Sequence, residues 1–191
     1  MKDKLSRTMT IKNNDELKQW IAKGGRPKFI FFWGHQKAKS GVSKSCFSQW
    51  YSAPFEENGI RFKTAEHYMM YHKAMLFGCP DIGEQIIASS HPNEAKQLGR
   101  KVTGFDEAVW HEKRFDIVVS ANRLKFSQNP ELKDFLLSTG KRILVEASPV
   151  DKIWGIGLAA DHELADIPAK WKGLNLLGYA LMVVRGELGG E

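Results

Sequence analysis

"FEENGIRFKTAEHYMMYHKA", residues 55–74, holds the clearest local structural signals in the chain. Asn58-Gly59 is a turn signal between a predicted strand and a second short strand at residues 60–62, which together predict a β-hairpin. Thr64 is a good helix N-cap, so a helix is predicted to begin there. This stretch is therefore predicted to contain strand, turn and helix start within twenty residues.

The predicted helix carries a carboxylate and an amine on one face. Glu66 and Lys73 are seven residues apart, close to two helical turns, so their side chains leave the helix in nearly the same direction. One interpretation is a structural one, because a first-turn Glu favours the helix N-terminus and Lys73 can reach solvent. The other is chemical, because a partly desolvated Lys is a nucleophile and a neighbouring Glu can carry protons.

The rest of the sequence predicts one α+β domain, mainly α-helical. Apolar, aromatic residues 28–33 predict a buried strand, and the polar, Gly/Ser-rich residues 34–45 predict a loop. Further strands are expected within residues 46–57 and at 60–62 and 142–148. Helices are expected after Asn14, from Thr64, from about Pro92 to Gly99, from Asp106 to Asn129-Pro130, at 131–138 and at about 174–188.

Positive charge is concentrated in the N-terminal quarter of the chain. Residues 1–45 hold 11 Lys or Arg against three acidic residues, whereas the remaining 146 hold 17 against 19. We therefore expect a basic N-terminal arm with a short helix at residues 1–27 and one domain at residues 28–191. Such an arm either attracts phosphates, as in nucleic-acid contact, or is simply solvated.

The N-terminal twenty residues have no apolar segment of the secretory type, and no apolar run is long enough to span a membrane. Cys46 and Cys79 are therefore expected to be reduced thiols, and the protein is expected in the cytoplasm without membrane contact. The sequence does not predict an oligomeric state.

Other residues are candidates for ligand contact, each with a structural alternative. Trp33-Gly34 follows a predicted strand, where loops often hold ligands. Trp154-Gly155 lies in a W-G-x-G segment, which either allows close backbone approach to a ligand or forms a tight turn. Arg100 follows a helix, so it either meets a phosphate or complements the helix C-terminus.

Several site classes have no support in the sequence. The His and Cys residues lack the spacing of a zinc site, so no metal is expected. A Walker A loop, a G-x-G-x-x-G fingerprint and a G-x-S-x-G motif are all absent from the sequence. Nothing therefore indicates a P-loop enzyme, a dinucleotide cofactor or a serine hydrolase.

Five blocks of sequence together resemble the NADAR superfamily, which includes the YbiA-like proteins. They occur in family order, and the resemblance covers about residues 29–188. The blocks are TAEHYMMYHKA (64–74), AKQLGRKV (95–102), RLKFSQNPELKDFLLSTG (123–140), LVEASPVDKIWGIGL (144–158) and GLNLLGYALMVVRGEL (173–188).

The resemblance implies a NADAR/YbiA-like fold and metal-free, cofactor-free cleavage of N-glycosidic bonds to ribose. It implies that Lys73 attacks the anomeric carbon to form a Schiff base, with Glu66 as the matching acidic residue. It also matches Trp110, Asp151, Trp154 and Asn175 to pocket positions of the family.

The implied substrates are ADP-ribose linked to guanine in nucleic acid, so that the reaction would reverse ADP-ribosylation, or phosphoribosylamino-pyrimidine intermediates of riboflavin biosynthesis. The form of the FFWGH, QWYSAPF and AEHYMMYHKA segments is closer to the branch shared by fungi, protists and phages, which favours the first. Stacking on Trp33, Trp110 or Trp154 and phosphate contact from Arg100 fit either substrate. The alternatives are a non-catalytic ADP-ribose or nucleotide binder and a nucleic-acid module that uses the basic arm.

Overall fold

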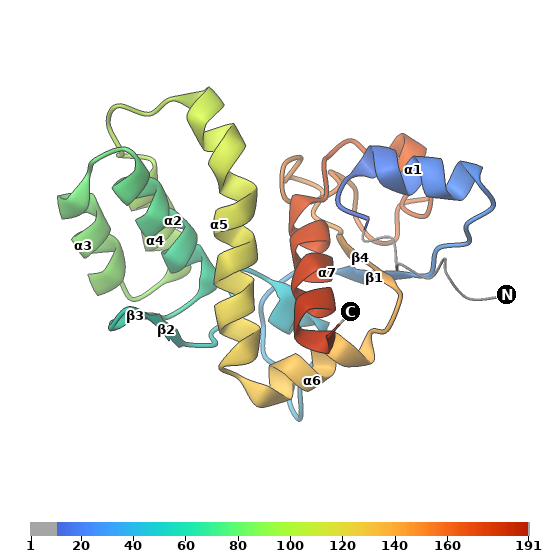
Figure 1. The fold of residues 1–191 in the computed structure, drawn as a ribbon, viewed down its shortest axis with the longest axis horizontal. Coiled ribbons are helices and arrows are strands. Elements are labelled where there is room, and N and C mark those ends of the chain that lie inside the picture. Colours follow the sequence, from blue (N-terminus) through green and yellow to red (C-terminus); the bar gives the residue numbers. More distant parts are fainter. Residues whose placement is uncertain (1–10, 191) are drawn as a thin grey trace, which may run out of the picture. The chain divides into compact units, whose positions relative to one another are not determined.

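The computed structural model of the chain describes residues 11–190 and has the mainly helical α+β fold that the sequence predicts (Figure 1). The chain forms two compact units. We call residues 31–140 the central unit. The terminal unit consists of the described residues up to Ile30 together with those from Lys141 onward.

The central unit is built around one helix. Its elements are η1 (Lys44–Phe47), β2 (Phe55–Glu57), β3 (Ile60–Phe62), α2 (Ala65–Leu76), α3 (Pro80–Ala88), α4 (Pro92–Gly99), α5 (Glu107–Ser127) and α6 (Pro130–Ser138). The helix α2 packs against α3, α4 and α5 (Figure 1). Because three helices cover it, most of α2 is buried, including the charged residue Glu66.

The hairpin and the helix start are confirmed. β2 pairs with β3 in antiparallel register, and Asn58 and Gly59 have φ of 51° and 80°, the left-handed conformation that such a two-residue turn requires. Thr64 caps α2 by accepting a hydrogen bond from the His67 amide. A cluster of buried aromatic and small residues joins the hairpin to α2 and α5: Phe55, Phe62, Ala65, Tyr68 and Ala121.

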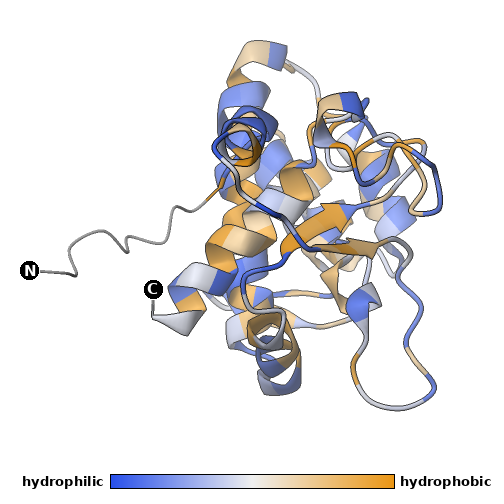
Figure 2. Cartoon of the chain, turned by 90° about the vertical axis from the view of Figure 1, so that its right-hand side faces the viewer, coloured by the Kyte–Doolittle hydropathy of each residue, from blue (hydrophilic) through white to orange (hydrophobic). Residues whose placement is uncertain are grey.

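The terminal unit brings the two ends of the described chain together. Its elements are α1 (Asn14–Ala22), part of β1 (Phe29–Phe32), β4 (Ile143–Glu146), η2 (Pro168–Lys170) and α7 (Leu176–Gly189), and the boundary between the units falls within β1. β1 and β4 form a two-stranded sheet of largely hydrophobic residues (Figure 2). The helix α7 packs on β4, which is why three of the four β4 residues are buried.

The short helix expected in the N-terminal arm is present as α1, and it is packed rather than free. Leu17 is fully buried. The Asn14 amide donates to the Gly173 carbonyl at 2.9 Å, and its oxygen accepts from the Tyr179 hydroxyl at 2.8 Å. The first ten residues of the predicted arm lie outside the described residues, and the division at residues 27 and 28 stays a prediction.

Some local predictions were wrong. The N-cap of α1 is Asn13 rather than Asn14, and Gly99 is the last residue of α4 rather than the residue after it. Only Phe32 of the predicted buried strand is buried, and the other residues of β1 are partly exposed. Residues 46–54 form the end of η1 and turns, so the strand begins only at Phe55.

The prediction also missed α3. Pro80 occupies the first turn of this helix, a position where its missing amide hydrogen costs nothing. Ile82 and Ile86 are four residues apart on one face, and Ile86 is fully buried. The first-turn proline and the two isoleucines at helical spacing therefore indicate a helix at this position. No helix of the described residues has both the length and the hydropathy needed to cross a bilayer.

Candidate active site

Lys73 lies on the last turn of α2 in a half-buried aromatic surrounding within the central unit. Its ammonium donates a hydrogen bond to the Gly99 carbonyl at 2.9 Å. The same nitrogen lies 4.5 Å from the centroid of the Phe105 ring and 5.8 Å from that of Trp110. The two aromatic rings and the C-terminus of α4 therefore shield the amine from much of the solvent.

The electrostatic surroundings favour the neutral form of this amine. Burial lowers the pKa of Lys73, and the positive charge of Arg100 lowers it further. Desolvation removes the water that stabilises an ammonium ion, and a nearby like charge opposes protonation. A neutral amine is the nucleophilic form of lysine, so this position is suited to attack on an electrophilic carbon.

Glu66, the other half of the predicted pair, is buried near the start of the same helix, with 4% of its surface exposed. Its amide donates to the Gln49 carbonyl at 3.0 Å. Among the described residues, the partners of the Lys73 amine do not include the Glu66 carboxylate. Seven residues of helix separate their Cα atoms by about 10 Å along the axis, so a substrate would have to bridge the two groups.

A network of buried amides holds the backbone at Glu66. The Asn122 amide on α5 donates to the Gln49 side-chain oxygen at 2.9 Å and to the Val118 carbonyl. The Gln49 side-chain nitrogen is buried and has no hydrogen-bond partner among the described residues. Sequence reasoning did not single out Gln49 or Asn122, because their contact joins positions 73 residues apart.

His67 follows Glu66 and is fully buried. Its Nδ1 atom lies 2.8 Å from the Thr64 hydroxyl, and burial lowers its pKa to about 4. The ring is therefore neutral at physiological pH and belongs to the helix cap. Within residues 11–190, no three His, Cys, Asp or Glu side chains are grouped so that they could hold a metal ion.

The central unit thus brings three predicted residues together and leaves three others, Glu66, Trp33 and Gly34, apart from them. Lys73, Arg100 and Trp110 meet where α4 and the start of α5 pack against α2. Phe105 completes the cluster, and sequence reasoning did not single it out. Trp33 is 61% exposed, and its neighbour Gly34 has φ of 83°. No ring contact joins Trp33 to the Lys73 cluster among the described residues.

The other four candidates lie in the terminal unit, where their polar groups bind backbone. One Asp151 oxygen accepts from the Ile153 and Trp154 amides, both at 2.8 Å, and so shapes a turn. Gly155 follows, and a Cβ atom there would lie 2.8 Å from the Glu146 carbonyl oxygen. This glycine is needed because the turn lies directly against the end of β4.

Asn175 connects this turn to the last helix. It is fully buried in the left-handed conformation, with φ of 53°. Its side-chain oxygen accepts from the Glu146 amide at 3.0 Å, and its side-chain nitrogen donates to the Leu144 carbonyl at 3.0 Å. These bonds fix the start of α7 to β4, so the geometry gives Asn175 a positioning role. Substrate contact by the four residues stays a prediction.

Comparison with known proteins identifies the family. The family model of the NADAR domain matches residues 31–189, so one domain of the family spans both units. "N-glycosidase R617" of Acanthamoeba polyphaga mimivirus is 48% identical over 165 residues, covering 84% of this chain and 96% of the relative.

Two further matches extend the comparison. The maize "Riboflavin biosynthesis protein PYRR, chloroplastic" is 38% identical over 142 residues, which are 70% of this chain and 21% of that protein. The NMR structure of the E. coli protein YbiA superposes with a TM-score of 0.69 at 28% identity, covering 86% of this chain and 87% of that one.

Proposed function

The chain belongs to the NADAR family, and from that premise we propose that it is an N-glycosidase that releases a base from a ribosylated substrate. The observation that carries the proposal is the environment of Lys73. This amine has a lowered pKa, aromatic neighbours on which a base or sugar can stack, and an arginine nearby for a phosphate.

The proposed first step forms a bond between the Lys73 nitrogen and the anomeric carbon of the ribose. The bond from this carbon to the base nitrogen breaks, and its electron pair leaves with the base, which takes up a proton. The amine must first leave the Gly99 carbonyl, which rotation of the flexible lysine side chain allows.

In the second step the sugar ring opens. The bond from the anomeric carbon to the ring oxygen breaks, the ring oxygen takes up the proton that the amine loses, and a protonated imine joins Lys73 to the sugar. Water then adds to the imine carbon, and hydrolysis returns the free amine and releases the sugar with its phosphate group, as ADP-ribose or ribose phosphate. Glu66 is proposed to give the proton to the leaving base and to accept one from water.

The proposed substrate is an ADP-ribosyl group on guanine or a phosphoribosylamino-pyrimidine. Both present a ribose, a flat base and phosphate, which match a nucleophilic amine, aromatic rings and a guanidinium. Similarity to a mimivirus N-glycosidase along nearly the whole relative supports the activity, and the maize riboflavin protein keeps the second substrate in consideration.

Incubating the purified protein with each substrate in parallel, and measuring free base by mass, tests this proposal. Borohydride reduces an imine, so a trapped adduct on the peptide containing Lys73 is expected with the true substrate. Binding of ADP-ribose without base release or trapping would instead support the non-catalytic binder. Release that continues in the Lys73→Ala variant would exclude the covalent step.

A further inference from the structure

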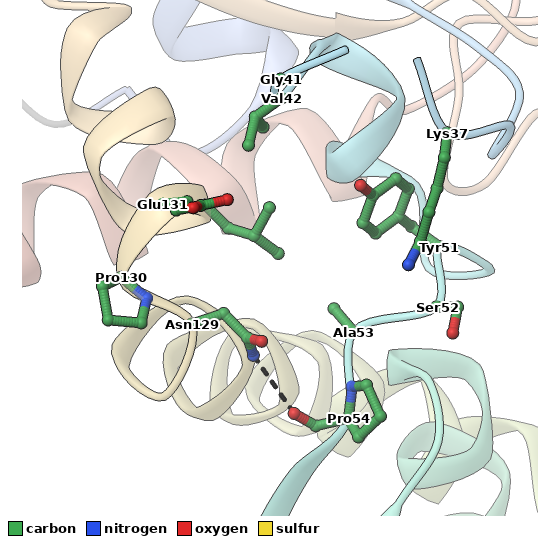
Figure 3. A pocket seen from close by; sticks show the side chains of 11 residues that line it. Lys37, Gly41, Val42, Tyr51, Ser52, Ala53, Pro54, Asn129, Pro130 and Glu131 are labelled. Carbon is green, nitrogen blue, oxygen red and sulfur yellow. Dashed lines mark hydrogen bonds between the residues drawn. The ribbon is translucent and has the colours of Figure 1, made fainter. Parts of the chain in front are cut away.

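The central unit contains a cavity of about 580 Å³ at the start of α6 (Figure 3). Three segments form its walls: the loop that contains Lys37 and Gly41-Val42, the segment 51–54 that leads into β2, and residues 129–132. Its volume lies within the range of roughly 300–1,000 Å³ that small-molecule sites occupy.

This cavity is separate from the Lys73 site. Trp110, beside Lys73, lies on the first turn of α5, whereas Asn129, in the cavity wall, follows the last turn of the same helix. Nineteen residues at a helical rise of about 1.5 Å per residue place the two ends about 28 Å apart. One small ligand cannot occupy both places.

The hydroxyl group of a largely buried tyrosine points into the cavity. Tyr51 is 7% exposed, and its hydroxyl is turned toward the open space of the cavity (Figure 3). This hydroxyl has no hydrogen-bond partner among residues 11–190. The Lys125 and Lys37 amines lie 5.6 and 5.8 Å from the centroid of its ring. Burial raises the pKa of Tyr51, so the hydroxyl keeps its proton and can donate.

Two acceptors face the same space. The Asn129 amide nitrogen already donates to the Lys125 and Pro54 carbonyls, at 2.7 and 3.2 Å, which leaves its oxygen for another donor. The Glu131 carboxylate extends into the cavity from the first turn of α6 (Figure 3). The remaining wall is mostly apolar: Val42, Ala53, Pro54, Pro130 and Leu132.

A carboxylate binds two adjacent N–H groups best, because its two oxygens accept in parallel. The Tyr51 hydroxyl and the Lys37 ammonium, on the other side of the cavity, can both donate a hydrogen bond to a carbonyl of the ligand. The apolar walls favour a ligand with a flat, largely uncharged ring system. Guanine combines these features, since its amide and exocyclic amino groups lie next to each other and its carbonyl lies beside them.

We propose that this cavity is a second binding site, for a guanine base, in which Glu131 accepts from the two adjacent N–H groups and Tyr51 donates to the carbonyl. The site rests on the cavity and not on the activity proposed for Lys73. The base can come from a free nucleoside or from a single-stranded nucleic acid, which present the same edge.

Calorimetry with the full-length chain and its Lys73→Ala variant tests the site. Guanosine is expected to bind both equally, and to bind at least about tenfold more tightly than adenosine, which lacks the paired N–H groups. Inosine, without the exocyclic amino group, should fall between them. An oligothymidine strand carrying one guanine separates the sources: binding comparable to guanosine shows that the site accepts strands, and binding only of guanosine restricts it to the free nucleoside.

Two variants locate the binding. Glu131→Gln keeps the shape of an exposed side chain and should weaken guanosine about tenfold, and Tyr51→Phe, which removes only the hydroxyl, should weaken it about fivefold. Glu163→Gln, at an exposed carboxylate of the terminal unit, is the matched control and should change nothing. Equal affinity for adenosine and guanosine, or full affinity in Glu131→Gln, would overturn the proposal.

Discussion

Two lysines of the central unit, Lys73 on α2 and Lys125 on α5, are both shielded from water, but they differ in burial and in their hydrogen bonds. Lys125 is fully buried and donates to the Cys46 and Ser48 carbonyls, at 2.6 and 2.9 Å. Lys73 is half-buried and donates to one carbonyl. Lys125 therefore ties η1 to α5, whereas Lys73 lies where a ligand can reach it.

The comparison shows that a lowered pKa does not by itself identify a reactive amine. Burial lowers the pKa of Lys125 to about 8, partly offset by the Cys46 thiol. Lys73 also has a lowered pKa, with Arg100 rather than an anion beside it. The two amines differ in access, because a fully enclosed amine cannot meet a substrate and the half-buried amine of Lys73 can.

The largest expected difference between the lysines is in activity. Lys73→Ala should reduce base release at least about a thousandfold, since the covalent step loses its nucleophile, and the thermal unfolding midpoint should hardly change. Single-turnover assays and a thermal melt measure the two quantities. Lys113→Ala, at an exposed α5 lysine paired with Glu112 at 2.7 Å, is the control and should stay fully active. A comparable loss in the control would remove the special role of Lys73.

Lys125→Met should have the opposite effects: it should lower stability and leave activity nearly unchanged. The substitution keeps most of the side-chain volume but leaves the two carbonyls without their donor, which is expected to lower the free energy of unfolding by about 3 kcal/mol. Base release per folded molecule should stay close to that of the wild type. Urea denaturation followed by circular dichroism gives the first quantity. Unchanged stability would mean that the buried amine does not hold η1 in place.

Lys125 also makes the stability of the protein depend on pH. Between pH 8 and 10.5 the unfolded chain binds more protons at Lys125 than the folded chain does, so the free energy of unfolding rises with pH. Burial raises the pKa of Cys46 from 9.0 to about 12, which lowers stability as pH rises above 9. The Lys125 effect is therefore clearest between pH 8 and 9.

Between pH 8 and 9 the free energy of unfolding of the wild type should rise by up to about 1 kcal/mol, because the folded chain loses one proton at Lys125 that the unfolded chain keeps. The Lys125→Met variant should not show this rise. Urea titrations at closely spaced pH values measure both proteins. Parallel pH curves for the two would show that the buried amine is not the group that titrates.

The smallest expected effect concerns the aromatic cover of Lys73. Phe105 is 45% exposed, so Phe105→Ala should leave the fold intact while it admits water to the amine. The pKa of Lys73 should then rise toward its ordinary value, which moves the rise of activity with pH to higher pH. Val109→Ala, at an exposed side chain on the first turn of α5, should leave the profile in place. A profile unmoved by Phe105→Ala would show that the ring does not desolvate the amine.

Local signals explain what could be predicted. Thr64 caps α2 and Asn58-Gly59 turns the hairpin, as expected, because each acts through its own backbone and the next few residues. The helix expected from Asp106 is α5, with Asp106 as its N-cap. The helix face of Glu66 and Lys73 follows from periodicity alone. The missed helix α3 also carried a local signal, its first-turn Pro80.

Contacts between distant segments could not be read from the sequence. Phe105 and Gly99 reach Lys73 only because α4 and the α5 start pack on α2. Gln49 meets Asn122 across 73 positions. Lys125, which looks like an ordinary surface lysine in RLKFSQ, is fully buried because η1 lies over it.

The sequence by itself determined the family resemblance, the caps and turns, and the presence of a carboxylate and an amine on one helix face. Those properties depend on neighbours along the chain. Only the tertiary structure decided which lysine is enclosed and which is reachable, and that Tyr51 turns its hydroxyl into a cavity. Desolvation and access depend on which segments pack together, and the spacing of residues does not specify that packing.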